Sequence, residues 1–521
     1  MNDHNLFAAL RASFPSDLDT PAIETDAGLC YSWRDLDHGT ARIANLLDSL
    51  ALPEGARIAV QTEKSVEALM LYLATLRSGH VYLPLNTAYQ PSEIEYFIGN
   101  AEPSVIVCTT KNLEWISRLA TKSGAMHVFT LDDDGTGSLT ALARSQSDQH
   151  AVAAKGADDL AAILYTSGTT GRSKGAMLSH GNMLSNAVTL KHYWDWQPDD
   201  VLVHALPIFH VHGLFVAVHG ALLNGSKMLW CARFDARRVT ELLPRATMFM
   251  GVPTLYVRLL AEPSFGREAC RRMRLFISGS APLLLDTFNA FRERTGHTIL
   301  ERYGMSETIM LASNPCRPED GERVGGTVGR PLPGVEVRVV DGQGAHCRVG
   351  DIGNIEVRGP NVFKGYWRMP EKTRDEFTYD GWFKTGDVGR FDANGYLSIV
   401  GRNKDLIISG GYNVYPAEVE SYINELPGVS ESAVIGLPHP DFGEAVAAVV
   451  VPKLGAAPDP ETIVAQLKGQ IANFKVPKRV FFEAELPRNT MGKVQKNTLR
   501  ARYADAFNPP SGAGQSLSPV A

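Results

Sequence analysis

Strand-like and helix-like segments alternate along the first several hundred residues, and this alternation limits the folds that the chain can adopt. Short apolar strands are expected at 57–60 and 81–83. Between them, Ser65 caps a predicted helix that Gly79 ends. The apolar residues of this helix recur at helical spacing, at Val66, Met70, Leu73 and Leu76. Repeated strand–helix–strand units predict an α/β fold of mostly parallel sheets covered by helices.

The later part of the chain has a different pattern. Between about 321 and 400, short strands such as 335–340 and 354–357 are broken by Gly and Pro. These breaks indicate a small antiparallel or barrel-like piece. After it, a compact α+β segment is expected, with a helix that starts at Asp459-Pro460 and a strand at 478–482.

The chain has 521 residues, which is too many for one compact core. The change of pattern therefore predicts a large N-terminal domain over residues 1–402 and a small α+β C-terminal domain over residues 403–505. The last stretch, Ser511–Ala521, is small and polar, and we expect residues 506–521 to form a disordered tail.

Composition excludes several classes of protein. The net charge of -6 implies no general attraction to nucleic acid or to an anionic membrane. No stretch approaches the ~20 apolar residues of a membrane span, and the start, Met1 to His4, lacks the features of a secretory signal. The six scattered cysteines form no C-x-x-C pair, so neither a zinc site nor a disulfide framework is expected. These features favour a cytoplasmic enzyme with reduced thiols.

The segment Tyr165–Gly175 has the strongest functional signal. It follows a predicted apolar strand and has the sequence YTSGTTGRSKG. Its glycines let the backbone approach a polyphosphate. Its polar side chains add hydroxyl donors and positive charge, from Thr166, Ser167, Thr169, Thr170, Ser173, Arg172 and Lys174. The spacing is not that of a Walker A element, and a polar surface loop is the structural alternative.

The same segment offers a second interpretation, because Gly171–Gly175 fits the G-x-S-x-G pattern of serine hydrolases. A nucleophile elbow needs its serine on one sharp turn between a strand and a helix. Seven residues separate Tyr165 from Ser173. A hydrolase is therefore kept as a remote alternative.

Six more motifs follow the loop in order. They are Leu206–Gly213 (LPIFHVHG), Tyr303–Thr308 (YGMSET), Phe383–Asp387 (FKTGD), Gly401–Asp405 (GRNKD), Ser409–Asn413 (SGGYN) and Pro487–Lys493 (PRNTMGK). Together with the loop, this set resembles the adenylate-forming superfamily, which contains acyl-CoA synthetases, peptide-synthetase adenylation domains and beetle luciferases. The match runs from the first strand–helix–strand unit to about Leu499.

The resemblance implies an AMP-forming acid–CoA ligase that uses ATP, Mg²⁺ and coenzyme A. It assigns the catalytic Glu307 and Thr166 to the metal, a role for which a hard carboxylate oxygen is suited. It assigns the remaining nucleotide contacts to Ser167, Gly168, Thr169, Thr170, Gly171, Lys174, Ser280, Ala281, Tyr303, Gly304, Ser306, Thr308, Asp387 and Arg402. Taken alone, Glu307 could be a surface carboxylate at a helix start.

Two of these nucleotide residues have physical interpretations of their own. The Tyr303 ring could stack on a nucleobase or simply belong to the core. We expect Asp387 on a turn between strands, where it could accept hydrogen bonds from the ribose hydroxyls or merely stabilise the turn.

By the same resemblance, Lys493 is the catalytic lysine of the adenylation step. Its ammonium could bridge the acid's oxygen and the α-phosphate. Thioester formation needs this lysine withdrawn, so a mobile C-terminal domain is expected to rotate about Lys404. Gly410 and Gly411 would then let the pantetheine arm of CoA pass, although a Gly pair is also an ordinary tight turn. Acylation of Lys493 would remove its charge and silence the enzyme.

Within the superfamily, malonyl-CoA synthetases are the closest likeness. It lies in stretches such as Gln61–Leu69, Pro84–Tyr89, Met250–Thr254, Arg274–Leu283 and Asn361–Trp367. The resemblance implies malonate as the acid and a place in fatty acid metabolism. Methylmalonate, acetate or propionate are the alternative substrates.

A malonate enzyme must bind a second carboxylate, and Arg258 is the predicted partner. It lies at an apolar helix start, where an unpaired guanidinium would be costly to bury. Glu262, one helical turn away, is an equally plausible internal partner. His210 could add a contact or simply pack beside Phe209. Phe209 and Val211 stand where a tyrosine and a threonine are expected, which leaves the choice between malonate and methylmalonate open.

Overall fold

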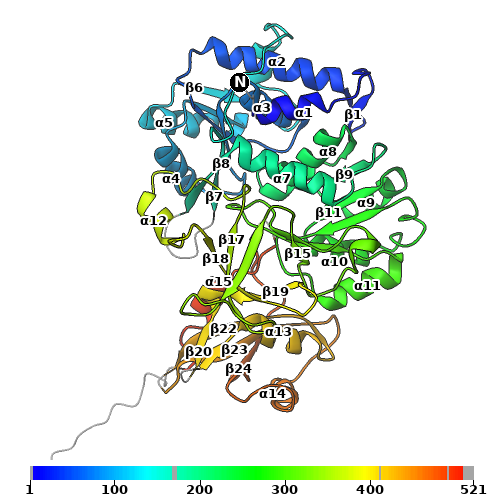
Figure 1. The fold of residues 1–521 in the computed structure, drawn as a ribbon, viewed down its shortest axis with the longest axis vertical. Coiled ribbons are helices and arrows are strands. Elements are labelled where there is room, and N and C mark those ends of the chain that lie inside the picture. The colour runs from blue at the N-terminus through cyan, green and yellow to red at the C-terminus, as the bar shows by residue number, and fades with distance from the viewer. Residues whose placement is uncertain (1–3, 167–172, 410–411, 440, 490–491, 508–521) are drawn as a thin grey trace, which may run out of the picture.

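The computed structural model describes residues 4–166, 173–409, 412–439, 441–489 and 492–507. It is an α/β molecule built around four sheets, with the C-terminal part at one end of its long axis (Figure 1). Among the described residues, no helix has both the length and the apolar character needed to cross a bilayer.

The first large sheet has six strands in the order β6-β5-β3-β4-β7-β8. All neighbours run parallel except β7 and β8, which form an antiparallel hairpin. The strands are β3 (Arg57–Gln61), β4 (Val81–Pro84), β5 (Val105–Cys108), β6 (His127–Thr130), β7 (Leu160–Thr166) and β8 (Lys174–Ser179). The helices of this region are α1 (Leu6–Ala12), α2 (Trp33–Ser49), α3 (Val66–Arg77), α4 (Pro91–Ala101), α5 (Leu113–Ser123) and α6 (Ser138–Ala143), with a 3₁₀ turn at Thr110–Asn112.

Local sequence explains the unit from β3 to β4 that was predicted. The Ser65 hydroxyl accepts a hydrogen bond from the Ala68 amide and caps α3. Gly79 has a φ of +74° just beyond the helix and turns the chain into β4. The predicted strand–helix–strand unit is confirmed.

The second large sheet has nine strands in the order β15-β14-β13-β12-β11-β9-β10-β1-β2. Its strands are β1 (Pro21–Thr25), β2 (Cys30–Ser32), β9 (Val201–His204), β10 (Lys227–Trp230), β11 (Met248–Gly251), β12 (Leu275–Ser278), β13 (Leu300–Tyr303), β14 (Ala312–Ser313) and β15 (Arg330–Pro331). The run from β1 to β13 is parallel, so the carboxyl ends of these strands share one edge. The helices are α7 (His180–Tyr193), α8 (His219–Asn224), α9 (Ala236–Leu242), α10 (Pro253–Ala261) and α11 (Leu285–Thr295), with irregular helical turns at His212–Val218, Leu243–Arg245 and Pro318–Asp320.

The antiparallel piece expected after residue 321 is a four-stranded sheet in the order β16-β17-β18-β19. Its elements are β16 (Glu336–Val340), β17 (Gly353–Arg358), β18 (Phe383–Phe391) and β19 (Leu397–Arg402), with α12 (Pro370–Asp375) between β17 and β18. A short 3₁₀ turn at Asn403–Asp405 leads from β19 into the C-terminal part.

The C-terminal part is a five-stranded sheet with three helices. Its elements are β20 (Ile407–Ser409), β21 (Tyr412–Val414), α13 (Pro416–Asn424), β22 (Val429–His439), β23 (Gly443–Pro452), α14 (Pro460–Lys468), β24 (Arg479–Phe482) and α15 (Lys496–Arg502). Residues along β22 alternate between two buried clusters, with Val434 on one face and Ile435 on the other. The sheet thus has a core on both faces, separate from the main core of the N-terminal part.

Candidate functional site

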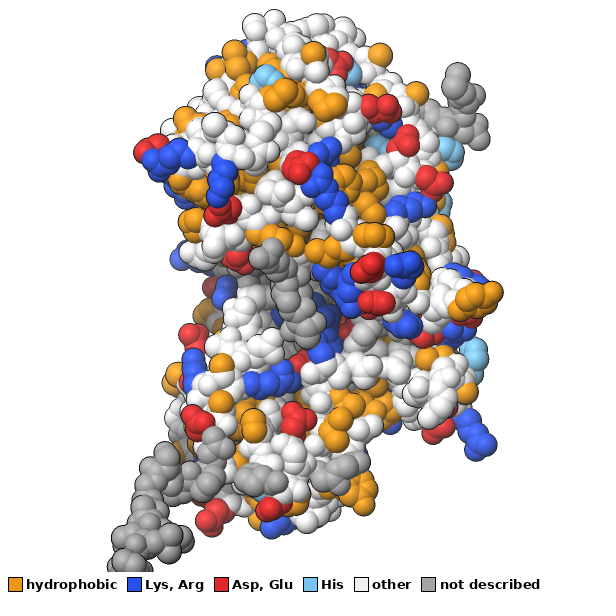
Figure 2. All heavy atoms as spheres, turned by 90° about the vertical axis from the view of Figure 1, so that its left-hand side faces the viewer, with side chains coloured by type: hydrophobic (Ala, Val, Ile, Leu, Met, Phe, Trp, Pro, Cys, Tyr) orange, Lys and Arg blue, Asp and Glu red, His pale blue; other side chains and the backbone are white. Residues whose placement is uncertain are grey.

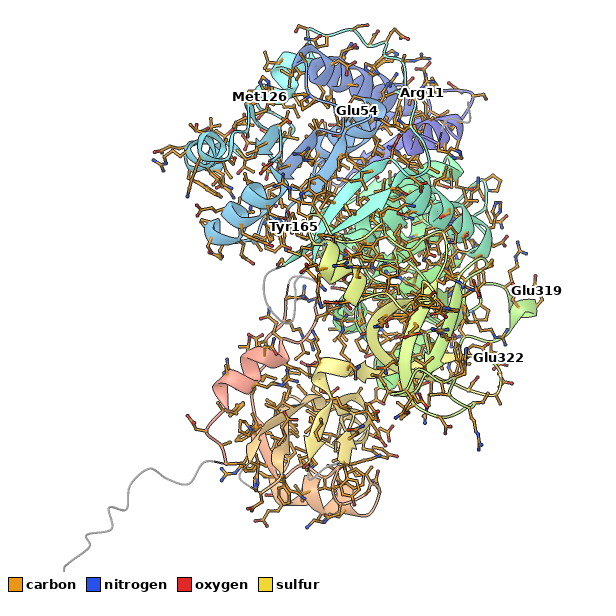
Figure 3. All side chains as sticks on the ribbon, turned by 60° about the vertical axis from the view of Figure 1, so that its left-hand side comes forward. Arg11, Glu54, Met126, Tyr165, Glu319 and Glu322 are labelled. Carbon is orange, nitrogen blue, oxygen red and sulfur yellow. The ribbon has the colours of Figure 1, made fainter. Side chains whose placement is uncertain are left out.

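The predicted phosphate loop connects the two strands of a hairpin. Thr166 ends β7 and pairs with Lys174, which starts β8. Tyr165, labelled in Figure 3, lies at this end of the hairpin. The predicted contacts Ser167, Gly168, Thr169, Thr170 and Gly171 lie outside the described residues.

The hairpin decides against the serine hydrolase interpretation. Ser173 comes directly before β8, which is an antiparallel strand and not a helix. A nucleophile elbow requires the helix, because the turn into it exposes the serine hydroxyl. The G-x-S-x-G pattern therefore lacks the local geometry that would make Ser173 a nucleophile.

Glu307 is buried beside the hairpin, and the alternative of a surface carboxylate is wrong. Burial raises its pKa. The Tyr366 hydroxyl donates a 2.9 Å hydrogen bond to Glu307 Oε1, and the Lys174 ammonium lies 4.2 Å above the centre of the Tyr366 ring. The metal-ligating candidate Glu307 is thus connected to the start of β8 through one tyrosine.

The oxygen donors of Glu307 and Thr166 suit a cation that is held mainly by phosphate. Within the described part of the chain, no three His, Cys, Asp or Glu side chains are grouped to form a metal site. Mg²⁺ is commonly bound through one or two carboxylates together with substrate phosphates. Glu307, with Thr166 at the end of β7, supplies a donor set of that kind.

Tyr303, Asp387 and Arg402 come together from three strands. The Tyr303 hydroxyl donates to Asp387 Oδ2, and Arg402 Nε lies 3.0 Å from Asp387 Oδ1. Asp387 lies within β18, opposite Arg402 on β19, so the expectation that it lies on a turn is wrong. The ladder and Arg402 hold this buried carboxylate in one orientation.

The other predicted nucleotide residues follow β12 and β13. Ser280 has a φ of +73°, and its hydroxyl lies 3.4 Å from His212 Nδ1. Its neighbour Ala281 is half-buried. After β13, Gly304 and Ser306 are half-buried and Thr308 is buried. These positions share one edge of the nine-stranded sheet, at the carboxyl ends of parallel strands where ligands commonly bind.

Lys493 reaches this edge from the C-terminal part. It lies on a turn in which Asn489 N donates to Lys493 O and Gly492, with a φ of +75°, packs near Thr254 of α10. Lys493 is exposed to solvent, although its ammonium lies close enough to Arg402, Asp387 and Glu307 to feel their charges. Desolvation and the charge of Arg402 lower the pKa of Lys493 to about 8, against the opposite effect of Asp387 and Glu307.

One residue of this site, Arg302, was not among those that the motifs predicted. It lies on β13 and is 3% exposed, and two of its nitrogens, Nε and Nη2, have no hydrogen-bond partner among the described residues. Its guanidinium packs against Gly279, where a Cβ atom would come within 2.5 Å of Arg302 Cζ. Burial lowers the pKa of Arg302 to about 9.

His210 lies in the same region. Desolvation, together with the charges of Lys493 and Arg302, lowers the pKa of His210 to about 3, so the imidazole is neutral. Its Nδ1 accepts a hydrogen bond from the His212 amide at 3.3 Å. Arg302 and His210 therefore present a buried cation and a neutral imidazole near Lys493.

Arg258 differs from what the sequence predicted. It lies on α10 but is exposed, so its guanidinium does not need a buried partner. Glu262 is not engaged with it in the expected way, because Glu262 Oε1 accepts hydrogen bonds from the Ser264 amide and hydroxyl.

Arg258 instead lines a cavity of about 380 Å³ between the two parts of the chain. The cavity is bounded by Phe209 and Thr254 of the N-terminal part and by Gly492 of the C-terminal part. Its other basic side chains are Lys64, Arg233 and Arg488, and the acidic Glu63 also lines it. An anionic ligand could therefore approach the turn that carries Lys493 through this cavity.

The predicted hinge residue Lys404 is exposed on the short turn between β19 and β20. Its two neighbours contact different parts of the chain. Asn403 Nδ2 donates to Asn354 Oδ1 of β17, in the N-terminal part, at 2.8 Å. Asp405 Oδ1 accepts from Arg500 of α15, in the C-terminal part, at 2.8 Å. Gly410 and Gly411, the predicted CoA contacts, lie outside the described residues.

Family models match both parts of the chain. The model described as AMP-binding enzyme matches residues 12–367, and the one described as AMP-binding enzyme C-terminal domain matches residues 418–493. The chain belongs to the AMP-binding enzyme family. The resemblance to adenylate-forming enzymes that the motifs indicated is confirmed.

Two individual relatives match nearly the whole chain. The chain is 35% identical to a malonate–CoA ligase from Arabidopsis thaliana, over 95% of this chain and 88% of that protein. It is 56% identical to MatB from Rhodopseudomonas palustris, over 97% of this chain and all of that one. The TM-score is 0.94 with the ATP-bound crystal structure of MatB and 0.84 with the apo structure.

Proposed function

We propose that the chain is an AMP-forming acid–CoA ligase that converts malonate, ATP and CoA into malonyl-CoA, AMP and pyrophosphate through a malonyl-adenylate. The observation that carries the choice of acid is the buried guanidinium of Arg302 beside the candidate site, whose Nε and Nη2 donors have no partner in the described part of the chain. The likeness to a malonate–CoA ligase over nearly the whole chain supports the same choice.

Arg302 replaces Arg258 in the proposed binding of the far carboxylate. A buried arginine with free Nε and Nη2 donors is stabilised when a carboxylate accepts from both. His210 contributes a neutral imidazole that can donate one hydrogen bond to the same acid. A monocarboxylate such as acetate would leave the guanidinium without a partner, so the pocket favours a dicarboxylate.

In the adenylation step the near carboxylate attacks the α-phosphorus of ATP and pyrophosphate leaves. Lys493 neutralises the negative charge that gathers where the two anions meet. Asp387, held by Tyr303 and Arg402, accepts hydrogen bonds from the ribose hydroxyls. Glu307 and Thr166 would hold Mg²⁺, which shields the phosphate charge when it is bound.

In the second step the thiol of CoA attacks the adenylate carbonyl and AMP leaves. The cavity beside Lys493 is the proposed entry for CoA, and Arg258 and Arg233 at its wall would bind the CoA phosphates. Because the Lys493 turn forms part of that wall, the C-terminal domain must move to open it. Asn403 contacts the N-terminal part and Asp405 contacts the C-terminal part, which supports Lys404 between them as the hinge.

The higher TM-score with ATP-bound MatB supports an arrangement that is ready for adenylation. Domain boundaries at 402/403 and 505/506, acylation of Lys493, a cytoplasmic location and a place in fatty acid metabolism stay predictions.

A pyrophosphate-release assay over acetate, propionate, malonate, methylmalonate and succinate tests the function. The expected result is release with malonate that depends on ATP and Mg²⁺, with AMP and malonyl-CoA as the other products. Release of ADP in place of AMP would refute adenylation. Faster turnover of acetate or propionate than of malonate would refute the choice of acid, and a preference for methylmalonate would assign that close analogue as the substrate.

A further inference from the structure

Lys174 is the last charged residue of the predicted phosphate loop, yet a carboxylate of the protein already pairs with it. Its Nζ lies 3.2 Å from Glu376 Oε1. Both side chains are about four-fifths buried, with 20% and 23% of their surface exposed. An ion pair with this little solvent competes with any phosphate for the same ammonium.

Glu376 is held firmly in this position. It follows α12 directly, and its backbone carbonyl accepts a 2.8 Å hydrogen bond from the Lys384 amide of β18. The carboxylate comes from a segment some two hundred residues beyond the loop in sequence, so only the tertiary fold creates the pair.

A second cation allows Glu376 to release Lys174. Lys372 of α12 lies four residues before Glu376, and its Nζ is 3.2 Å from the same oxygen, Glu376 Oε1. When Lys174 moves away, Lys372 still neutralises the Glu376 carboxylate, so no unpaired charge is left in this largely buried position. Lys372 is 47% exposed and is free to follow.

Lys174 can turn toward a phosphate without leaving its other contact. Its ammonium lies over the face of Tyr366, whose hydroxyl is bonded to Glu307. The aromatic face attracts the ammonium without fixing the direction of its N–H groups. Figure 2 shows the side of the molecule that is on the left in Figure 1, where α12 is labelled, and on this side Lys and Arg side chains gather near the middle.

We propose that Glu376 is a positioning residue that holds Lys174 in a resting ion pair and gives it up to the polyphosphate of ATP. The pair would thus weaken the binding of ATP and of pyrophosphate, and Glu376 would recover Lys174 as pyrophosphate leaves. This proposal rests on the proposed function, in which the loop binds ATP.

The test compares three single variants by the KM for ATP and by the inhibition constant of added pyrophosphate. E376Q should lower both constants at least about two- to fivefold, which is the range for exposed ion pairs, because this pair is less exposed than those. K372A should raise both, because Glu376 then has Lys174 as its remaining partner. E114Q is the matched control: it removes the same charge from the exposed i,i+4 pair of Glu114 and Arg118 on α5 and should change neither constant.

The double variant K174A/E376Q separates this role from a structural one. Against a K174A background, the E376Q change should have no effect on either constant. The single variant E376D keeps the carboxylate, so both constants should stay near their wild-type values. Unchanged or weaker binding of ATP in E376Q would overturn the proposal. Wild-type protein that released no pyrophosphate with any acid would instead refute the proposed function, so the two failures are distinguishable.

Discussion

Replacing Arg302 with methionine tests the acid pocket most directly. Methionine keeps much of the volume and flexibility of the side chain but removes the buried charge, so the packing against Gly279 is preserved. Because Nε and Nη2 of Arg302 have no partner among the described residues, no protein hydrogen bond at these atoms is lost. The effect should therefore fall on the substrate and not on the fold.

The magnitude follows from the burial of the guanidinium. Removing one partner of a buried, hydrogen-bonded charge pair costs about 2–5 kcal/mol, so kcat/KM for malonate should fall roughly 30- to several-thousandfold. Acetate and propionate lack the second carboxylate. Their kcat/KM should stay within about threefold or rise, because the unpaired charge that opposed them is gone.

The assay is pyrophosphate release at subsaturating acid, with malonate and propionate compared in parallel. R258M is the matched control, since Arg258 is exposed on α10 and should leave the ratio of malonate to propionate unchanged. Thermal unfolding should show R302M to be at least as stable as the wild type. An equal loss with both acids, at unchanged stability, would refute the assignment of Arg302 to the far carboxylate.

Three further outcomes are expected. K493A should abolish formation of the adenylate, by about 10²-fold or more, while transfer of supplied malonyl-adenylate to CoA persists; equal loss of both half-reactions would contradict the role of Lys493. R258A should raise the KM for CoA about tenfold or more, as the loss of one phosphate contact, with little change in the KM for malonate, and the reverse result would return Arg258 to the acid pocket. The adenylation rate of the free enzyme, followed as kcat/KM for ATP, should fall as pH rises through about 8, because the pKa of Lys493 is lowered to about 8 and only its protonated form carries the charge; a flat profile up to pH 10 would contradict this.

Local features of the sequence predicted much of the fold. The Ser65 cap, the apolar spacing of α3 and the following glycine act within a few residues, so they are visible without the rest of the chain. The same holds for Asp459, whose side chain caps α14 through the Thr462 amide. The order of the strands in a sheet is not visible locally in the sequence, because β1 pairs with β10 across some two hundred residues.

The candidate site, like the fold, was predicted from the sequence only in part. Motif order identified Glu307, Asp387 and Lys493, which the structure brings to one region. The placement of Asp387 on a turn was wrong, because the β18–β19 ladder continues through it. The roles of these residues in ATP chemistry stay predictions until the experiments above are done.

The sequence by itself determined the kind of chemistry, since the loop after β7, the carboxylates and the lysine near the C-terminus are all carried by short motifs. Only the tertiary structure decided which arginine is buried beside the candidate site. Arg258 has apolar neighbours in the sequence and Arg302 follows Glu301, yet α10 presents Arg258 to solvent and β13 buries Arg302. Side chains alternate between the two faces of a strand, so the direction in which Arg302 points depends on what the sheet packs against, and that is set by segments far away in the chain.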